Sequence, residues 1–273
     1  MTDARPIGVF DSGVGGLTVA RALMEHLPNE SLIYIGDTAR FPYGPKPVEE
    51  IRHHGMQIAD ELIGRDVKML VVACNSVEVS AIDHIAARHG VPVIGVVEPG
   101  ARASARVTRS GRIGMIGTEA TVRSGAYDRA VAETGADVTL ASAACPVFVN
   151  HVEAGDTGSD ELRRAARRYL EPLMEADIDT LILGCTHYPL LSELLQEELG
   201  TGVVLVSSAE ETADDVAARL LAEELAVAGG PPSHRFLTTG RADTFDELAA
   251  TFLGTEQATV RAEHLDLPGA PWS

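Results

Sequence analysis

Aromatic residues and long apolar runs are both scarce in this chain. Phe, Trp and Tyr make up only 4% of its 273 residues, so the core must be aliphatic, built from Val, Leu, Ile and Ala. The longest apolar stretches, such as Met69–Cys74, have the length of a β-strand, whereas a membrane span needs about 20 apolar residues. The N-terminal residues lack the charged and then apolar segments of an export signal. We therefore expect a cytoplasmic protein with no membrane partner.

Basic residues are in the minority as well. The 22 Lys and Arg residues are outnumbered by 40 Asp and Glu residues, which gives a formal net charge of −18. A field of this sign repels nucleic acid and anionic membrane surfaces, so we expect no direct nucleic-acid binding. An anionic substrate would have to be held by local backbone amides and hydroxyl groups, because the global field opposes it.

Cysteine is limited to Cys74, Cys145 and Cys185. An odd number of cysteines in a cytoplasmic chain argues against a disulfide framework. The absence of any CxxC pair argues against a structural zinc site, and we expect no bound metal. The cysteines are therefore either small buried hydrophobic residues or reactive thiols.

Short aliphatic runs alternate with amphipathic segments along nearly the whole chain. Continuous apolar strands separated by helices are typical of parallel sheets covered on both faces, and such sheets bind ligands at the carboxyl ends of their strands. The sequence therefore predicts an α/β fold of mainly parallel sheets flanked by helices. The expected strands are Ile7–Phe10, Leu32–Ile35, Met69–Ala73, Val93–Val97, Arg112–Ile116, Val138–Ala141, Thr180–Leu183, Val203–Val206 and a further one near Arg235–Thr238. The expected helices are Leu17–Leu27, Val48–Ile63, Val77–His89, Thr121–Glu133, Glu161–Glu175 and Glu211–Ala226.

Two pairs of matching segments indicate an internal duplication. The segment that begins at Ile7 resembles the one that begins at Ile113, 106 positions later (113 − 7). The residues around Cys74 resemble those around Cys185, 111 positions later (185 − 74). Two nearly equal offsets in the same order predict two similar halves.

We expect these halves to be two pseudo-symmetric domains. The first would contain residues 1–97 and 209–273, and the second residues 98–208. A pseudo-twofold axis between them would bring Cys74 and Cys185 to opposite sides of an active-site cleft between the domains.

Each of these two cysteines follows a predicted strand and precedes polar residues. Cys74 also lies where a helix is expected to begin, and the backbone N–H groups there can lower the pKa of a thiol from its usual value of about 8.5. A single cysteine in such a place is more often an inert buried residue. Two cysteines at equivalent strand ends are much rarer by chance, which favours reactive thiols.

Other polar groups are expected at the same strand ends. Asp11-Ser12 leads into a glycine-rich turn that could cradle a carboxylate or phosphate, although the turn matches no nucleotide-binding motif. An aspartate in this position is by itself more often a helix cap. Thr118 with Thr121, and Asn75 with Ser76, add hydroxyl and amide donors at two further expected helix starts.

Seven ordered segments of the chain resemble the signature of the glutamate racemases. They extend from residue 7 to residue 191, and several such motifs in the right order are far more specific than any one of them. His187 is similar to the residue that glutamate enzymes carry after Cys-Thr, where aspartate racemases usually carry Glu. The segments are Val9–Gly16, Phe41–Gly44, Ala73–Ser76, Gly95–Gly100, Ile116–Thr118, Cys145–Val149 and Leu183–Leu191.

The resemblance implies roles for the matching residues. Cys74 is implied to take the α-proton from D-glutamate and Cys185 to take it from L-glutamate. Asp11 is implied to assist Cys74, His187 to assist Cys185, and Glu153 matches a further acid near the second thiol. The candidate substrate-binding residues are Asp11, Ser12, Tyr43, Gly44, Asn75, Ser76, Thr118, Thr121, Thr186 and His187.

Racemisation by two thiols is physically reasonable without a cofactor. It needs an acid on each face of a planar carbanion, one protonated and one deprotonated at any moment, in a dry cleft that stabilises the developing charge. Lys46 and Lys68 are the chain's only lysines, and neither is a strong candidate to bind pyridoxal phosphate. We therefore expect no cofactor. The resemblance further implies a homodimer that supplies D-glutamate for peptidoglycan synthesis and so for cell-wall biogenesis and cell shape.

The motif after the first thiol departs from the usual pattern. Ser76 and Val77 stand where the family usually has Thr and Ala. Serine keeps the hydroxyl group, whereas the bulkier valine is expected to crowd the substrate pocket.

Three other functions stay open on the sequence alone. A hydantoin racemase or maleate isomerase would share the fold and the paired cysteines. A protein that acts mainly by binding DNA gyrase would keep that binding after both thiols are mutated. A pair of solute-binding domains would tolerate Cys→Ser at both positions.

Overall fold

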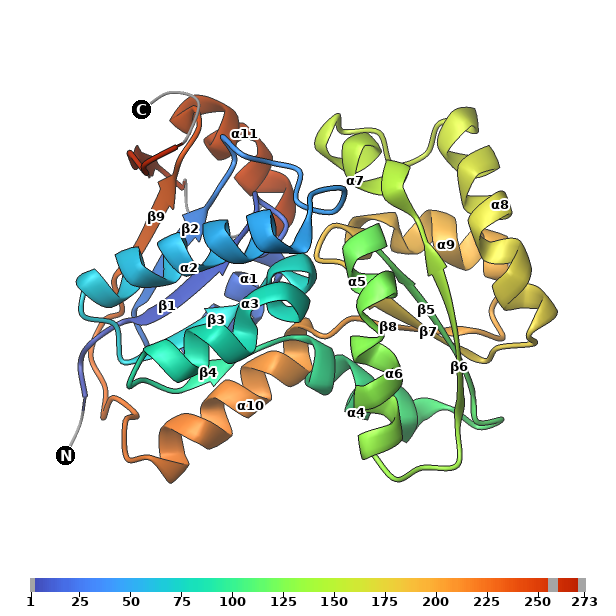
Figure 1. Cartoon of the computed structure of the whole chain (residues 1–273), viewed down its shortest axis with the longest axis horizontal. Coiled ribbons are helices and arrows are strands. Elements are labelled where there is room, and N and C mark those ends of the chain that lie inside the picture. The colour runs from blue at the N-terminus through green and yellow to red at the C-terminus, as the bar shows by residue number, and fades with distance from the viewer. Residues whose placement is uncertain (1–2, 255–259, 270–273) are drawn as a thin grey trace. The chain divides into compact units, whose positions relative to one another are not determined.

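The computed structural model of the chain describes residues 3–254 and 260–269. The chain divides into two compact units. Unit 1 consists of Met1–Val96 and Ala209–Ser273, and unit 2 of Val97–Ser208. Each unit contains its own parallel β-sheet with helices on both faces (Figure 1). The α/β fold with mainly parallel sheets is therefore confirmed.

As far as unit 1 is described, its sheet has six strands in the order β10-β9-β2-β1-β3-β4, and all of these strand pairs are parallel. The central strands are fully buried because helices cover both faces, which explains their continuous apolar sequences. The strands are β1 (Ile7–Asp11), β2 (Leu32–Gly36), β3 (Met69–Val72), β4 (Val93–Ile94), β9 (His234–Thr238) and β10 (Ala262–His264).

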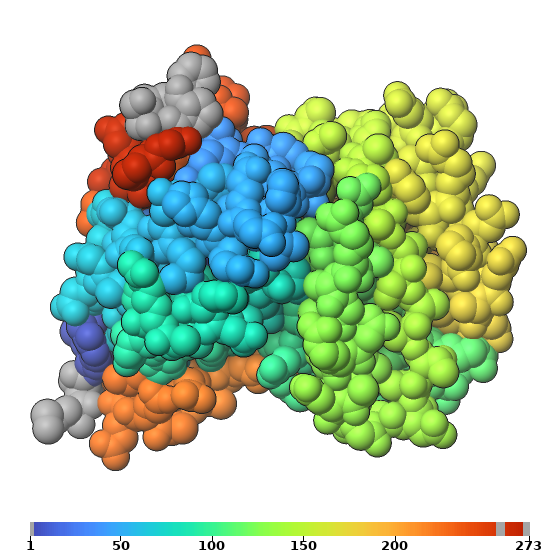
Figure 2. Space-filling view, viewed as in Figure 1, coloured from blue at the N-terminus to red at the C-terminus, as the bar shows by residue number. Residues whose placement is uncertain are grey.

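Among the described residues of unit 1, five helices flank this sheet in two groups. The helices α2 and α3 pack against each other, and their outer surfaces lie side by side in Figures 1 and 2. The helices α10 and α11 both pack against α1. The helices are α1 (Leu17–His26), α2 (Val48–Gly64), α3 (Asn75–Arg88), α10 (Ala209–Ala222) and α11 (Ala242–Leu253).

The sheet of unit 2 has four parallel strands in the order β6-β5-β7-β8. The helices α4 and α6 pack together, and α8 packs against α7 and α9. The strands are β5 (Arg112–Gly117), β6 (Thr139–Ala144), β7 (Thr180–Gly184) and β8 (Val204–Val206). The helices are α4 (Val97–Val107), α5 (Glu119–Ser124), α6 (Ala126–Glu133), α7 (Pro146–Glu153), α8 (Asp160–Glu175) and α9 (Ser192–Leu199), with a 3₁₀ turn, η1 (Tyr188–Leu191).

The two sheets share a four-strand order. In unit 1 the first four strands of the chain lie in the order β2-β1-β3-β4, and unit 2 repeats this order as β6-β5-β7-β8. Ile7 and Ile113 lie in the equivalent strands β1 and β5. Cys74 and Cys185 follow the equivalent strands β3 and β7. The similarity of the two halves is therefore confirmed at the level of topology.

Two expected elements differ from the structure. The expected helix Thr121–Glu133 is broken into α5 and α6 at Gly125, whose φ of +62° lies in the left-handed region that favours glycine. The expected strand Val93–Val97 ends at Ile94, and Val97 already begins α4. The strand stops because the backbone N–H of Val96 donates to the Glu78 carboxylate instead of to a neighbouring strand.

Several elements were not expected from the sequence, namely α4, α7, α9, α11 and β10. The helix α7 is only eight residues long and α9 is equally short, so neither shows a clear helical period. Within the described ranges, every helix is too short or too polar to cross a membrane.

Candidate active site

The first half of the candidate site lies at the carboxyl edge of the unit 1 sheet. Asp11 is the last residue of β1, Asp37 follows β2, and Cys74 follows β3 by two positions. These three strands are neighbours and run parallel, so their carboxyl ends meet. The sheet thus gathers two carboxyl groups and a thiol at one edge.

Cys74 lies at a helix start, as expected, and is the N-cap residue of α3, which begins two residues before the expected Val77. Its Sγ lies 3.5 Å from Oγ of Ser12, and the side chain is 6% exposed. Burial, reinforced by the charge of Asp11, raises the pKa of the Cys74 thiol. The expectation that the helix start lowers this pKa is therefore wrong, because loss of hydration outweighs the hydrogen bonds from Ser12 and the α3 backbone. A raised pKa favours the protonated thiol of Cys74 at neutral pH.

Asp11 and Ser12 form the start of the glycine-rich turn. The Asp11 carboxylate is fully buried and accepts a hydrogen bond of 2.7 Å from the backbone N–H of Gly13. The turn approaches its neighbours closely at Gly16, where a Cβ would lie 2.6 Å from Cβ of Asp11 and 2.9 Å from Cβ of Ala73. Glycine at this position therefore lets β1 and β3 place Asp11 and Cys74 in the same small region.

Asn75 and Ser76 are the first residues of α3, and both are buried. The following residue, Val77, is fully buried and packs against Gly55 of α2, so its bulk is accommodated between two helices. Gly55 thus provides space for one methyl group of Val77, and the crowding of the substrate pocket by Val77 stays a prediction.

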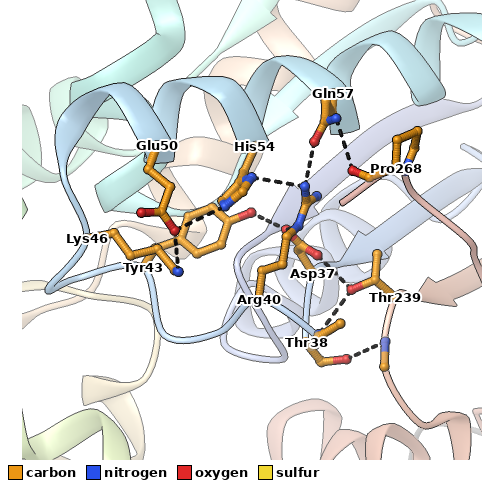
Figure 3. Close-up of polar contacts among 12 residues, drawn as sticks. Asp37, Thr38, Arg40, Tyr43, Lys46, Glu50, His54, Gln57, Thr239 and Pro268 are labelled. Atoms are coloured by element: carbon orange, nitrogen blue, oxygen red, sulfur yellow. Dashed lines mark hydrogen bonds and ion pairs between the residues drawn. The ribbon is translucent and has the colours of Figure 1, made fainter. Parts of the chain in front are cut away.

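Tyr43 and Gly44 lie in the turn between β2 and α2. The Tyr43 side chain is 1% exposed, and its hydroxyl group donates a hydrogen bond to Oδ2 of Asp37 (Figure 3). Burial, together with the nearby Asp37 charge, raises the pKa of Tyr43. The hydroxyl group is therefore neutral and faces the interior of unit 1.

Asp37 and Arg40 are buried charged residues that the sequence analysis missed. Arg40 Nε donates to Asp37 Oδ2 at 2.7 Å, and the arginine side chain is only 4% exposed. The sequence did contain a signal for Asp37, because this residue closely follows a predicted strand, as Asp11 does. The polar residues around this pair are shown in Figure 3.

The second half of the candidate site lies at the carboxyl edge of the unit 2 sheet. Cys185 and Thr186 follow β7 directly, and both are 7% exposed. The chain then forms η1 instead of a full helix, and the N–H of Tyr188 donates to the Cys185 carbonyl group at 3.1 Å. The surroundings of the two thiols therefore differ, although the strands that carry them are equivalent.

The buried His187 pairs with the partly buried Glu153 beside Cys185. The ring nitrogen Nδ1 of His187 lies 3.9 Å from Sγ of Cys185, and Nε2 lies 2.9 Å from Oε1 of Glu153. Burial disfavours the charged ring, but the hydrogen bonds to Cys185 and Glu153 outweigh it and raise the pKa of His187 to about 10. A positive charge therefore stands beside the sulfur of Cys185 at neutral pH.

Thr118 and Thr121 lie at the end of the central strand of unit 2. Thr118 is the N-cap of α5, its Oγ1 accepts a hydrogen bond from the N–H of Thr121, and the two hydroxyl oxygens are 3.0 Å apart. Both residues are buried. Because β5 and β7 are neighbouring parallel strands, these hydroxyl groups share the edge that carries Cys185.

The third cysteine, Cys145, follows β6 in unit 2 and is fully buried. Burial, with a contribution from the nearby Cys185, raises the pKa of Cys145. Its carbonyl oxygen accepts a hydrogen bond from the Tyr188 hydroxyl group at 2.9 Å. Across residues 3–254 and 260–269, the structure contains no group of three or more His, Cys, Asp or Glu side chains that could hold a metal ion.

Both lysines are engaged in ion pairs with glutamates. Lys68 precedes β3, at the opposite end of that strand from Cys74, and forms a buried ion pair of 2.6 Å with Glu30. Lys46 lies in the turn before α2 and forms an ion pair with Glu50. Each amine thus has a carboxylate partner of its own in unit 1.

Both units thus share a parallel α/β fold, and each carries a buried thiol after an equivalent strand. The chain belongs to the Asp/Glu/Hydantoin racemase family, whose model matches residues 17–216. It is therefore an enzyme of the racemase class of isomerases.

Within this family, the chain is similar to glutamate racemases over nearly its whole length. A glutamate racemase from Saccharopolyspora erythraea is 52% identical over 260 residues, which cover 94% of this chain and 95% of the relative. A solved glutamate racemase from Bacillus anthracis matches with a TM-score of 0.91 and 42% identity, covering 97% of this chain and 98% of that one. The glutamate racemase from Francisella tularensis, solved in complex with D-glutamate, matches with a TM-score of 0.90 and 33% identity, covering 97% and 99%.

Proposed function

We propose that this protein interconverts L-glutamate and D-glutamate by proton transfer at Cα, with Cys74 and Cys185 as the two acid–base groups. The observation that carries the proposal is the repetition of a buried thiol after the equivalent strands β3 and β7. Similarity to glutamate racemases over more than nine-tenths of the chain supports glutamate as the substrate.

The proposed reaction removes the α-proton from one face of Cα and adds a proton to the opposite face. With D-glutamate, the thiolate of Cys74 takes the α-proton, and the thiol of Cys185 gives its proton to the opposite face of the planar carbanion. With L-glutamate, the two groups exchange roles. Each turnover therefore inverts the carbon and exchanges the thiol states, and no redox step is involved.

The thiolate of Cys185 is stabilised by the charged pair of His187 and Glu153. The protonated ring of His187 stabilises a thiolate on Cys185, and Glu153 holds that ring in place from its other nitrogen. Because the pKa of His187 is raised to about 10, the ring keeps its charge throughout the neutral range. His187 and Glu153 thus prepare the thiol of unit 2 for proton transfer.

The thiolate of Cys74 is stabilised in a different way. Its pKa is raised by burial and by Asp11, so the thiolate needs a positive charge that arrives with the substrate. The α-ammonium group of an amino acid provides this charge, and the carboxylate of Asp11 would bind it. Deprotonation of Cys74 would then be coupled to substrate binding.

Neutral donors are available to hold the two carboxylates of glutamate in an acidic protein. Hydroxyl and amide groups at the strand ends can donate to carboxylates without adding charge, which suits a chain of net charge −18. The proposed substrate-binding residues are Asp11, Ser12, Tyr43, Gly44, Asn75, Ser76, Thr118, Thr121, Thr186 and His187.

We further propose that the enzyme is a cytoplasmic homodimer and supplies D-glutamate for peptidoglycan. The supply of D-glutamate is supported by similarity to glutamate racemases of bacteria. The assembly can be checked by sedimentation of the purified protein, and the cellular role by D-glutamate dependence of a strain that lacks the gene.

The decisive experiment uses D₂O without added cofactor. L-glutamate and D-glutamate are incubated separately with the protein, and both optical rotation and deuterium at Cα are followed. Two-base chemistry predicts that the product enantiomer acquires deuterium from the solvent in both directions. Absence of rotation change and of exchange in both directions would exclude the racemase function.

Further measurements separate the alternatives. Turnover of a hydantoin or of maleate, with no turnover of glutamate, would indicate a different member of the family. Binding to DNA gyrase that survives replacement of both thiols would indicate a binding function that is independent of racemisation.

A further inference from the structure

Asp37 is a buried carboxylate surrounded by hydrogen-bond donors. It is fully buried, and its Oδ1 accepts a hydrogen bond of 2.7 Å from the Thr239 hydroxyl group. Its Oδ2 accepts from Arg40 Nε and from the Tyr43 hydroxyl group. Every one of these three partners is a donor, so a carboxylate is the group that satisfies all of them.

Arg40 connects Asp37 to the helix α2. Its Nη1 donates to Nδ1 of His54 at 2.9 Å and to the side-chain oxygen of Gln57 (Figure 3). Gln57 in turn donates to the Pro268 carbonyl group at 3.2 Å. The charge of Asp37 is thus balanced by a cation that is itself held by two side chains of α2, which fixes the orientation of the pair.

Tyr43 connects Asp37 to the turn of residues 41–44. The Tyr43 ring lies 5.5 Å from the His54 ring, and its hydroxyl group reaches Asp37 (Figure 3). Tyr43 therefore anchors the turn from inside unit 1, and the main chain of Tyr43 and Gly44 takes its position from that anchor.

Asp37 is also joined to the strand that carries Asp11. The backbone N–H of Asp37 donates to the Asp11 carbonyl group at 3.1 Å, because β2 and β1 are neighbouring parallel strands. One residue therefore links the end of β1, the turn of residues 41–44 and Thr239 after β9.

We propose that Asp37 is a positioning residue for glutamate binding, which acts by holding Tyr43 and thereby the turn of residues 41–44 in register with the end of β1. This inference rests on the proposed function, in which Tyr43 and Gly44 hold the substrate. Asp37 itself does not touch the substrate, so its loss should affect binding through Tyr43.

The test is a double-mutant cycle with D37N, Y43F and D37N/Y43F, measured as KM and kcat for both enantiomers of glutamate. An amide at position 37 cannot accept from all three donors, and Y43F removes one donor while keeping the ring. We expect D37N and Y43F each to raise KM about tenfold, which corresponds to the loss of roughly one good hydrogen bond, and to change kcat by less than about threefold. The double variant should match D37N, because Tyr43 has lost its partner already.

Glu30 offers a matched control at the other end of the same strand. It precedes β2, is 4% exposed, forms a buried ion pair with Lys68 and accepts a hydrogen bond from the N–H of Val227. E30Q therefore breaks a comparable buried pair of unit 1 away from the carboxyl edge. It should lower the melting temperature, as D37N does, and leave KM and kcat at their wild-type values.

The outcomes distinguish failure of the inference from failure of the proposed function. If wild-type protein racemises glutamate while D37N and Y43F keep its KM, the inference is overturned and the proposed function stands. If the KM effects of D37N and Y43F multiply in the double variant, Asp37 does not act through Tyr43 and the inference is overturned. If wild-type protein neither racemises nor exchanges, the proposed function fails and the inference fails with it. Should D37N fail to fold, Y43F still decides, because an unchanged KM in Y43F contradicts the anchoring role.

Discussion

The side chain of Val77 in α3 fills the space that Gly55 leaves open in α2. A Cβ built at Gly55 would lie 2.7 Å from Cγ1 of Val77, closer than real carbon atoms approach. The two helices thus meet through a glycine and a β-branched residue that directly follows the Cys74-Asn75-Ser76 motif. The pairing lets α3, and with it the first thiol, pack tightly on α2.

The contact between Gly55 and Val77 predicts that substitutions at these two positions have non-additive effects on the free energy of unfolding. G55A should lower the free energy of unfolding by up to about 2 kcal/mol, because overpacking costs about 1–3 kcal/mol while the gain in helix propensity is about 1 kcal/mol. In a V77A background the new methyl group has room, so G55A should become neutral or stabilising. The free energies are measured by urea unfolding of the four proteins.

Gly64 is the control for this cycle. It lies in the same helix, and a Cβ there would meet nothing within 4 Å. G64A should therefore not be destabilising in either background. If G55A destabilises the wild-type protein and the V77A variant equally, the two residues are not coupled.

The raised pKa of Cys74 predicts slow alkylation at neutral pH. Iodoacetamide reacts with the thiolate, so Cys74 should react at least about tenfold more slowly than free cysteine at about pH 7.5 and faster as the pH rises. D11N should accelerate the reaction, because the charge of Asp11 helps to raise this pKa. The rate is followed by mass spectrometry of the Cys74 peptide.

Cys145 provides an internal reference in the same experiment. Its pKa is raised mainly by its own burial, and Asp11 does not contribute to it. D11N should therefore leave the alkylation rate of Cys145 unchanged. Alkylation of Cys74 as fast as that of free cysteine at the same neutral pH would contradict the proposed protonated resting state.

The His187–Glu153 pair predicts a loss of stability at alkaline pH. Because the folded-state pKa of about 10 lies above the ordinary value of 6.5, the stabilisation is fully present below pH 6.5 and is lost as the pH rises through about 10. E153Q weakens the interaction that raises this pKa, so its stability should fall less over that window. The urea midpoint of both proteins is measured across this window, from about pH 6 to about pH 10.

His26 supplies a matched control for this titration. Its pKa is also raised, with the hydrogen bond to Asp214 as the largest cause, but the Asp214 side chain is 65% exposed. Solvent screens such pairs, so D214N should hardly change the slope of stability against pH. An E153Q slope equal to that of wild type would mean that Glu153 does not hold the charge on His187.

The two-thiol mechanism predicts the effects of three single substitutions. C74A and C185A should each lower racemisation by about 10²- to 10⁴-fold, the range for loss of a general acid–base group. C145A should keep most of the activity, although it also removes a buried thiol. Activity is measured as the initial rate of change in optical rotation from each enantiomer.

A mixing experiment tests whether both thiols serve one substrate molecule. Equal amounts of C74A and C185A should not restore activity, because each chain still lacks one of its two acids. Recovery to a quarter or more of the wild-type rate would indicate that the two thiols can act from different chains.

Much of the fold could be predicted because its signals are local. An apolar run such as Met69–Val72 and a 3.6-residue period such as that of α2 are properties of neighbouring residues, so most strands and the longest helices were placed correctly. The break at Gly125 and the short helix α7 were missed, because a few residues carry too little periodicity. Cys74 and Cys185 could be singled out for the same local reason, since each follows a strand closely.

By itself, then, the sequence determined the parallel α/β architecture, the duplication and the strand ends that carry the thiols, because residue order fixes all three. Only the tertiary structure decided which groups surround them. The contact between Asp37 and Thr239 joins residues 202 positions apart and exists because β9 pairs with β2, while Val77 finds its space only because α2 packs on α3. The raised pKa of Cys74 also depends on the tertiary structure. Burial by residues distant in the chain removes hydration and raises this pKa, whereas a helix start alone would have lowered it.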